Sequence, residues 1–367
     1  AQASAAGGGR GAAKAAGGSV STASYQVGAD ASWAPDIWGA VRRAVENARA
    51  NAQASAADLA NARLSAQMEL AVDYVTLREL DQQKRLLDAT VAAYRTSLQI
   101  TQNKYRAGNI ALADVLTAKS QLEAAEAQDA DLANQRAADE HAIAIFTGVP
   151  PADLTLPSGP WTLRLPAIPT EIPSTLLERR PDIAGAERRV AAANAEIGVN
   201  VAALFPTLNL SGQAGFASSN LGSLFSAPSF AWTAAASLAE TIFEGGLRHA
   251  RIRAAKGAFD EAVATYRQTV LTAFGQVEDN LSAQRILGGE EAYRAAASAD
   301  ADANEIIAVN QYRAGQVDYT TVVTAQALAL SDRVSLVQIQ ASRLTTAVDL
   351  IAALGGGWSA AELPKKP

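Results

Sequence analysis

Apolar residues recur at alternating intervals of three and four residues along the first long polar tract. Residues 40–107 contain no proline and no glycine, and strong helix formers such as alanine, leucine, arginine and glutamine dominate them. The apolar series consists of Leu77, Leu80, Leu87, Val91, Tyr94, Leu98 and Tyr105, and Lys84 and Thr101 take its two remaining positions. A mean spacing of 3.5 residues is typical of a left-handed coiled coil. The tract is therefore predicted to form one helix on the order of 100 Å long, at about 1.5 Å per residue.

The same helical scheme occurs twice in the chain. The turn motif Tyr105-Arg106-Ala107-Gly108 returns 207 residues later as Tyr312-Arg313-Ala314-Gly315. A return helix is predicted at 112–147, and the second copy at 246–314 and 319–354. Glycines at which a helix can bend interrupt the second long tract, namely Gly257, Gly275, Gly288 and Gly289. A period this long indicates two copies of one large folding unit rather than the short repeat of a solenoid.

Three segments of about ten residues alternate apolar and polar side chains, which is the period of a β-strand with one apolar face. They are Ser24–Trp33, Thr207–Phe216 and Phe230–Leu238. About ten residues is the length that a tilted strand needs to cross a bilayer, and aromatic residues at strand ends suit the membrane interface. The aromatic residues concerned are Tyr25, Trp33, Phe216, Phe230 and Trp232. A soluble sandwich edge is the alternative that this pattern leaves open.

These patterns predict a domain organisation with two similar halves. Residues 1–23 are expected to form a flexible loop or tail. The first half then consists of a strand at 24–38 and a helical hairpin at 39–149, and a proline-rich connector follows at 150–180. The second half consists of a helix at 181–203, two strands at 204–243 and a hairpin at 244–355, before a tail at 356–367. Pro181 suits the first turn of its helix.

Composition narrows the classes of function. The 367 residues carry a formal net charge of −6 without a clustered basic surface, so no nucleic-acid partner is expected. Cysteine is absent, which excludes disulfides and thiolate metal sites. His141 and His249 lie among alanines and charged residues, and we interpret both as solvated helix positions. Zinc spacings, nucleophile elbows and phosphate loops are missing, so we expect neither an enzyme nor a metal or other cofactor. The sequence contains no run of about 18 apolar residues, so no transmembrane helix is predicted.

Several motifs, jointly and in order, resemble the outer-membrane efflux proteins, the TolC-like, OprM-type channel components of resistance-nodulation-division pumps. These motifs are the two turns and the segments 176–183, 193–199, 205–208, 242–246 and 354–358. The resemblance covers residues 24–358. It implies a mixed α and β fold, in which a long α-helical coiled-coil barrel joins a transmembrane β-barrel, built as a tandem repeat in a homotrimer.

The family likeness also implies a function and partners. The expected function is the outer-membrane exit duct of a tripartite efflux pump, linked to multidrug resistance and extending into the periplasm. Such a duct passively conducts substrates delivered by an inner-membrane resistance-nodulation-division transporter and a periplasmic adaptor protein, and its barrel contacts outer-membrane lipid. Family members begin with further residues that carry the signal, often a lipidated cysteine, and the first strand. We therefore expect this sequence to start in the first loop between strands.

A passive duct needs a pore lining and a gate, and the resemblance places the gate at the helix turns. Asp114 follows the glycine of the first turn where relatives carry an aspartate, and Tyr312 is its expected hydrogen-bonding partner. A ring of three such carboxylates would repel itself and favour cations or respond to pH. An ordinary role at a helix start is the alternative for Asp114. The other candidate constriction residues are Asp318, Thr321 and Thr324, with Arg106 and Arg313 as possible salt-bridge partners.

The two turns are also the expected contact with the adaptor protein. The residues concerned are Arg106, Ala107, Gly108, Arg313, Ala314 and Gly315. The alternative is an ordinary helix-helix turn in which glycine supplies a left-handed conformation. For the whole chain, a trimeric coiled-coil interaction or structural protein and the outer-membrane duct of type I secretion stay open as alternatives.

Overall fold

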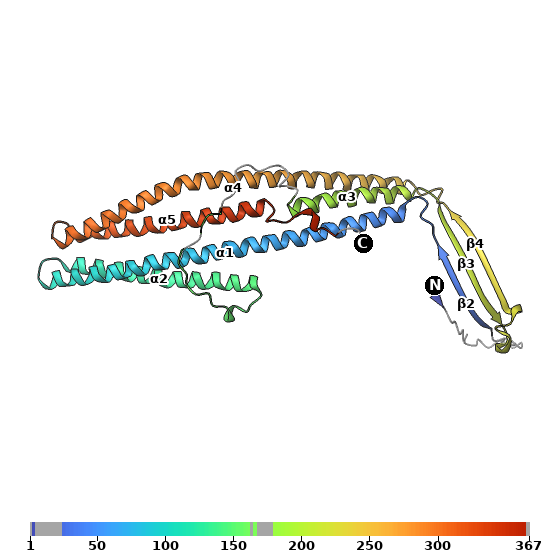
Figure 1. The fold of residues 1–367 in the computed structure, drawn as a ribbon, viewed down its shortest axis with the longest axis horizontal. Coiled ribbons are helices and arrows are strands. Elements are labelled where there is room, and N and C mark those ends of the chain that lie inside the picture. The colour runs from blue at the N-terminus through green and yellow to red at the C-terminus, as the bar shows by residue number, and fades with distance from the viewer. Residues whose placement is uncertain (1, 4–23, 162–163, 167–178, 365–367) are drawn as a thin grey trace. The chain divides into compact units, whose positions relative to one another are not determined.

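The computed structural model describes residues 2–3, 24–161, 164–166 and 179–364 (Figure 1). In chain order the main elements are β1 (Gln2–Ala3), β2 (Tyr25–Trp33), α1 (Ala40–Arg106), α2 (Leu112–Thr147), α3 (Pro181–Ala202), β3 (Thr207–Ser218), β4 (Phe230–Ala239), α4 (Leu247–Arg313) and α5 (Tyr319–Ala353). Short 3₁₀ turns lie at Pro151–Asp153, Leu221–Ser223, Ala227–Ser229 and Ala360–Glu362. The chain divides into two compact units, Ala1–Ala52 with Glu187–Thr265 and Gln53–Ala186 with Tyr266–Pro367.

The first unit contains one antiparallel sheet with the strand order β1-β2-β3-β4. Its pairing runs from Tyr25 opposite Ser218 to Trp33 opposite Leu210, and from Thr207 opposite Ala239 to Phe216 opposite Phe230. The three predicted strands are confirmed, and β3 extends two residues beyond its prediction. β1 differs from the expected tail, because Gln2 and Ala3 pair with β2. Two residues are too short to show an alternating pattern, and positions 1 and 4–23 lie outside the described residues.

Most side chains of this sheet are exposed. Every residue of β4 is exposed, whereas β3 alternates between exposed and partly buried positions over most of its length. Trp33 and Trp232 keep 66% and 69% of their surface exposed. Phe216 is an exception, because it packs against Phe225 and Phe230 with ring centroids 5.5 and 5.2 Å apart. Within the described residues, the apolar side chains of β4 therefore have no covering layer.

The start of α1 is fixed to its own unit by a cap and an aromatic contact. The carboxylate of Asp36 accepts hydrogen bonds from the backbone N–H groups of Val41 and Arg42, both at 3.0 Å, which satisfies donors that a helix start leaves free. The Trp38 ring stacks on Phe205, 4.6 Å between centroids, and its indole N–H donates to the carbonyl of Pro206 at 2.8 Å. Phe205 and Pro206, which precede β3, thus fix the position of Trp38 just before α1.

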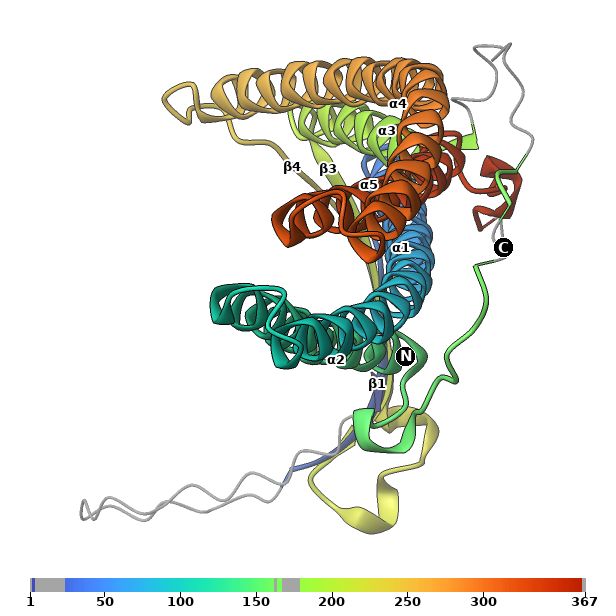
Figure 2. The same cartoon turned by 90° about the vertical axis from the view of Figure 1, so that its left-hand side faces the viewer.

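The second unit contains the greater part of two helical hairpins, α1 with α2 and α4 with α5, starting at Gln53 of α1 and Tyr266 of α4. Figure 2 shows the hairpins from their turn end. The predicted seam is confirmed over most of its length. Its members Leu77, Leu80, Leu87, Val91, Tyr94 and Thr101 are all buried. Leu98 is half-buried, and Tyr105 keeps 42% of its surface exposed, so the seam leaves the core at its last position. Burial of each of these leucine side chains stabilises the folded chain by roughly 1.5–3 kcal/mol.

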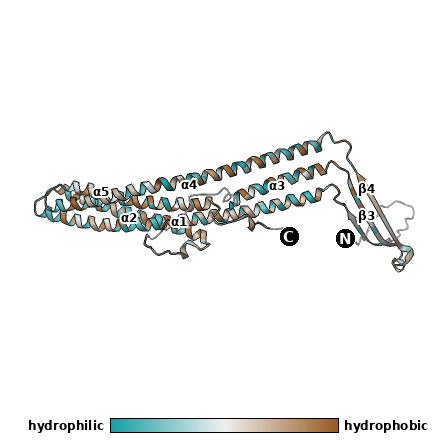
Figure 3. Ribbon diagram, turned by 45° about the horizontal axis from the view of Figure 1, so that its top comes forward, coloured by the Kyte–Doolittle hydropathy of each residue, from teal (hydrophilic) through white to brown (hydrophobic). Residues whose placement is uncertain are grey.

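The two long helices α1 and α4 have 67 residues each. α4 stays one continuous helix through its four internal glycines at 257, 275, 288 and 289. Figure 3 shows hydrophobic and hydrophilic residues interspersed along these helices. None of the helices in the described part of the chain has both the length and the apolar character that a membrane crossing requires.

The connector after α2 is held by a buried carboxylate on α1. Asp81, whose side chain is 1% exposed, accepts hydrogen bonds from Arg78 and Arg136, both at 2.8 Å, and from the backbone N–H of Gly159 at 3.1 Å. Burial works to raise the pKa of Asp81, but the hydrogen bonds from Arg136 and Gly159 outweigh it and lower the pKa below its usual value. The charged form of Asp81 is therefore the form that the fold stabilises.

Trp161 connects the end of this segment to both hairpins. Its ring packs against the cluster of Val75 on α1 with Ala341 and Leu344 on α5. Residues 162–163 and 167–178 of the predicted proline-rich connector lie outside the described residues.

α3 begins at Pro181, as predicted. Just before it, the buried Arg180 binds the carboxylate of Asp182, with contacts of 3.0 and 2.7 Å, and donates to the carbonyl of Ala353 at 2.9 Å. It also donates to Gln276 of α4 at 2.9 Å. One guanidinium thus joins the start of α3 to the end of α5 and to α4.

Candidate functional site

The two repeated turns have the same backbone geometry. Gly108 and Gly315 have φ angles of +76° and +75°, in the left-handed region that favours glycine. In each turn the glycine N–H donates to the carbonyl of the motif tyrosine, at 2.8 Å from Gly108 and 3.1 Å from Gly315. The next residue donates to the carbonyl five positions back, at 2.9 Å in both turns. The duplicated motif therefore encodes a duplicated helix ending.

The turn residues that sequence analysis assigned to adaptor contact are exposed. They are Arg106, Ala107, Gly108, Arg313, Ala314 and Gly315. Arg106 donates a hydrogen bond to the side chain of Asn103 at 2.8 Å, which keeps this guanidinium beside its own helix. The turns thus present two arginines and four small-residue backbones to solvent.

Tyr312, unlike its repeat partner Tyr105, is buried in a small core between the hairpins. It is 5% exposed and clusters with Ala118, Tyr319 and Val322. Its ring centroid lies 5.3 Å from that of Tyr319, and its hydroxyl donates to the hydroxyl of Thr101 at 3.5 Å. The sequence predicts a hydrogen bond between Tyr312 and Asp114. Among the described residues, Thr101 instead accepts the hydrogen bond of the Tyr312 hydroxyl.

Tyr319 closes the same core from the start of α5. It is 2% exposed, and its hydroxyl donates to the side-chain carbonyl of Gln121 on α2 at 3.3 Å. Burial, together with the neighbouring Tyr312 and Tyr94, raises the pKa of this hydroxyl far above its usual range. Tyr319 is thus a neutral donor across the whole physiological pH range.

Asp114 lies in the first turn of α2, where a negative charge is favoured by the helix dipole. It is half-buried, and its carboxylate has no hydrogen-bond or ion-pair partner among the residues that the structure describes. Its backbone N–H donates to the carbonyl of Ala111 at 3.2 Å. The side chain is therefore available for a partner outside this chain.

The three other predicted constriction residues lie at the start of α5 and are exposed. Asp318 is the N-cap residue, but its side chain makes no capping hydrogen bond. The backbone N–H of Thr321 donates to the Asp318 carbonyl at 3.1 Å, and the Thr324 hydroxyl donates to the carbonyl of Thr320 at 2.9 Å. The structure places all three in the first turns of one helix, on the opposite hairpin from Asp114.

Sequence reasoning missed three members of this region, namely Lys104, Gln121 and Tyr319. Lys104 donates to the backbone carbonyl of Tyr312, and its ammonium lies 4.0 Å from the centre of the Tyr312 ring. Tyr319 could have been found from its position, because it opens α5 directly after the second turn. Lys104 and Gln121 carry no comparable signal, since polar residues near helix ends are usually solvated.

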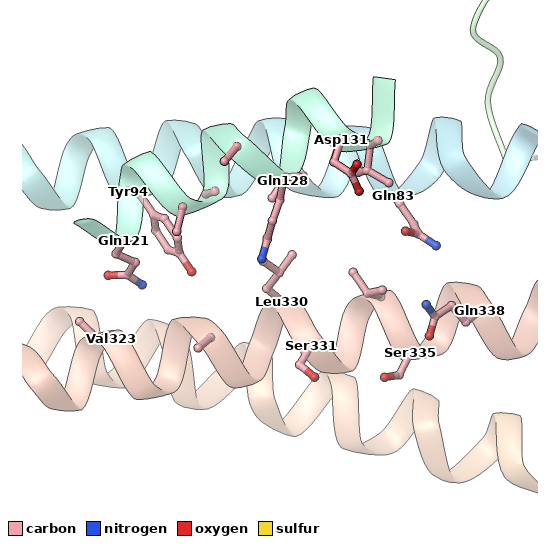
Figure 4. A pocket seen from close by; sticks show the side chains of 17 residues that line it. Gln83, Tyr94, Gln121, Gln128, Asp131, Val323, Leu330, Ser331, Ser335 and Gln338 are labelled. Atoms are coloured by element: carbon pink, nitrogen blue, oxygen red, sulfur yellow. The ribbon is translucent and has the colours of Figure 1, made fainter. Parts of the chain in front are cut away.

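A groove of about 830 Å³ separates the two hairpins further along their length (Figure 4). One wall is formed by α1 and α2 and the other by α5. Tyr94, Gln121 and Gln128 line the first wall, and Leu330 and Ser331 line the second. The groove mixes amide, hydroxyl and carboxylate groups with alanine, valine and leucine side chains, and its lining contains no cluster suited to a metal ion. More widely, no group of three or more metal-ligating side chains is found in the described part of the chain.

Comparison with known proteins agrees with this geometry. The sequence profile described as "Outer membrane efflux protein" matches residues 3–149 and 172–356. The chain belongs to the outer membrane efflux protein family. It is 32% identical over 339 residues to the solvent efflux pump outer membrane protein SrpC of Pseudomonas putida, covering 92% of this chain and 72% of SrpC. It is 31% identical over 339 residues to OprJ of Pseudomonas aeruginosa, covering 91% and 71%.

Solved structures give the same family assignment. The outer-membrane channel OprN superposes with a TM-score of 0.86 at 32% identity, over 92% of this chain and 76% of that one. The CusC channel superposes with a TM-score of 0.89 at 25% identity, over 97% and 83%. The efflux protein is therefore an outer-membrane exit duct of an efflux pump, in a family of channels rather than enzymes. This assignment decides against the soluble interaction protein.

Proposed function

We propose that this efflux protein works as a homotrimer that is closed at its two helix turns, with Asp114 in the constriction. The observation that carries the proposal is the half-buried Asp114 carboxylate, which has no partner among the described residues although it lies one helical turn before Ala118 of the buried turn core. Three such carboxylates around an axis would repel one another and attract cations. Asp318, Thr321 and Thr324 would add polar groups from the second hairpin.

Uncovered apolar side chains on α2 support the trimer. Leu112 and Leu116 are 50% and 57% exposed, and they share one face of the helix because they are one turn apart. Their equivalents in the second hairpin, Tyr319 and Val323, belong to the turn core. A neighbouring copy would cover the exposed face of α2, and the exposed side chains of the sheet would meet neighbouring strands and lipid in a shared β-barrel.

The partners proposed for this duct are a periplasmic adaptor and an inner-membrane resistance-nodulation-division transporter. The exposed arginines of the two turns, Arg106 and Arg313, are the groups available to an adaptor. Substrate selection then lies with the transporter, since a passive duct conducts what it receives. Replacing both arginines by glutamate should abolish co-purification with the adaptor and leave conductance of the isolated channel unchanged.

Single-channel recording in planar bilayers tests the constriction. We expect the complete wild-type protein to show small, cation-selective openings, and Asp114→Ala to show larger openings with weaker cation selectivity. Glu123→Ala is the matched control, because this exposed carboxylate lies on the opposite side of α2 and pairs with Lys119 at 3.5 Å. Equal conductance of wild type and Asp114→Ala would remove Asp114 from the gate, and a well-folded protein without conductance would contradict the duct.

A further inference from the structure

Lys104 connects the end of the first long helix to the end of the second. It lies in the last turn of α1, and its ammonium sits over the Tyr312 ring, 4.0 Å from the ring centre. The same ammonium donates a hydrogen bond to the Tyr312 backbone carbonyl. Tyr312 lies in the last turn of α4. One lysine therefore makes two contacts with the opposite hairpin, at the level where the helices turn.

These contacts are those that a cation prefers. The Tyr312 carbonyl also accepts the Gly315 N–H of the turn at 3.1 Å, and it lies at the negative end of the helix dipole, so an ammonium stabilises it. The face of a tyrosine ring also attracts a cation. Among the described residues, no carboxylate lies within ion-pair distance of Lys104, unlike Lys84 and Lys119, which both pair with acidic side chains. Tyr312 is thus the main partner of this charge.

The Tyr312 side chain is itself held by two further contacts. The Tyr312 hydroxyl is bound to Thr101, and its ring packs against Tyr319. Among the described residues the contact has no counterpart in the second hairpin, because the position equivalent to Lys104 is Gln311, which is neutral and exposed. At the level of the turns, the ammonium of Lys104 therefore joins the first hairpin to the second, and no lysine in the described part of the second hairpin makes the equivalent contact.

We propose that Lys104 is a latch, a positioning residue that holds α1 against the end of α4 in the closed channel. The proposal rests on the proposed function, since it explains how a closed turn region is maintained within each chain. Opening then requires the ammonium to leave the Tyr312 ring and carbonyl, while the helices themselves stay intact. Lys104 acts through Tyr312 and need not line the pore.

Distance measurement between the turns tests the latch directly. Residues 1–367 contain no cysteine, so cysteines introduced at Arg106 and Arg313 give two spin-label sites in this part of each chain. We expect Lys104→Met to broaden the distance distribution between these labels toward longer values and Lys104→Arg to restore the wild-type distribution, because arginine keeps the cation. Lys119→Met is the matched control, since it removes a lysine that pairs with Glu123 instead. A distribution unchanged in Lys104→Met, or unrestored by Lys104→Arg, would overturn the latch.

Conductance gives a second readout. The closed-to-open equilibrium of Lys104→Met should shift about tenfold toward the open channel, a factor that corresponds to about 1.4 kcal/mol. Tyr312→Leu should shift the equilibrium in the same direction, because it removes the ring and keeps the backbone carbonyl. The double variant should shift it by less than the sum of the two single variants, since the ring contact is common to both. Additive effects of the two substitutions would contradict the latch. Absence of any wild-type conductance would refute the proposed duct, whereas the label distances would still decide the latch.

Discussion

The two hairpins share a turn, a length and a backbone path, but they differ in how much of their shorter helix is buried. α5 buries residues along its whole length, from Tyr319 to Ala353, whereas α2 buries only Ala118, Ala125, Ile143 and Ala144. The motif tyrosines show the same contrast, since Tyr105 is 42% exposed and Tyr312 is 5% exposed. In a single chain, α5 belongs to the core and α2 forms an edge. Duplication thus preserved the backbone while burial diverged.

Charges show that the contacts between the helices of each hairpin were retained through this divergence. Arg95 on α1 pairs with Glu126 on α2 at 2.7 Å. The equivalent positions in the second hairpin are Asp302 and Arg333, which pair at the same 2.7 Å with the signs reversed. Both hairpins therefore keep an attractive charge pair at this level. The attraction requires opposite charges, but it does not depend on which helix carries the positive one. By contrast, the buried Asp81 has Gly288 as its equivalent. The cluster of Asp81 with Arg78, Arg136 and Gly159, here called the connector clamp, therefore belongs to the first hairpin alone.

Alanine substitution of the two motif tyrosines should give the largest difference in the free energy of unfolding. Tyr312→Ala should lower the free energy of unfolding by about 3–5 kcal/mol, because it empties a packed site, whereas Tyr105→Ala should cost less than about 1 kcal/mol. The measurement is chemical denaturation of the detergent-solubilised protein, followed by circular dichroism. Equal losses for the two variants would mean that the two turns are equally packed, contrary to the structure.

Removing the clamp carboxylate should have the next largest effect. Asp81→Asn leaves Arg78 and Arg136 without their shared anion, and we expect a loss of about 3 kcal/mol in the same denaturation experiment. Asp302→Asn is the control from the second hairpin, where the pair is partly exposed and should contribute less than about 1 kcal/mol. A loss for Asp81→Asn no larger than that of the control would contradict the clamp.

A carboxylate on α2 should affect stability in the opposite direction to Asp81. Burial, together with the nearby Asp73 charge, raises the pKa of Asp139, and one of its buried oxygens has no hydrogen-bond partner. The folded protein then binds this proton more tightly than the unfolded chain does. The stabilisation is fully present below the ordinary pKa of about 4 and is lost as the pH rises through the raised value.

Asp139→Asn should therefore raise the thermal midpoint at pH 7 and reduce its dependence on pH between 4 and 7. Asp131→Asn is the control on the same helix, because this exposed carboxylate binds Gln135. Thermal melts of both variants across that pH range make the comparison. A lower midpoint for Asp139→Asn at pH 7 would show that the Asp139 charge is stabilised by the fold.

The smallest expected effect comes from transplanting the reversed charge pair. Arg95→Asp alone should lose about 1 kcal/mol, because it places two carboxylates opposite each other, whereas Arg95→Asp with Glu126→Arg should return to within about 0.5 kcal/mol of wild type. Denaturation midpoints of the single and double variants suffice. A double variant as unstable as the single one would show that the order of the charges matters.

Much of this fold could be predicted because it is periodic. The seam from Leu77 to Thr101 and the strand alternation depend on local spacing, and both copies of the Tyr-Arg-Ala-Gly turn depend on one glycine conformation. The connector clamp could not be predicted, since it joins residues that are distant in sequence through backbone groups. The Gly159 N–H donates to Asp81, and the Leu156 carbonyl accepts from Arg136. The different burial of Tyr105 and Tyr312 was equally hidden, because identical motifs carry no information about which helix lies beside them.

The candidate site was predicted less completely than the fold. The family resemblance located the turns and the Asp114 position, and their role in gating stays a prediction. The hydrogen-bonding partner of Tyr312 was different from the one expected, because Thr101 faces it across the hairpins. Lys104 was missed because a lysine at a helix end is usually solvated, and only the three-dimensional approach of α1 to α4 gives it a partner.

Native mass spectrometry of the detergent-extracted complete protein gives the number of chains in one particle. We expect three chains for the wild type, because a neighbouring copy would cover the exposed apolar face of α2. For Leu116→Arg we expect dissociated chains with unchanged helical content, since this substitution places a charge on that face. A wild-type particle of one chain, or a Leu116→Arg particle that still contains three chains, would show that this face of α2 does not hold a trimer together.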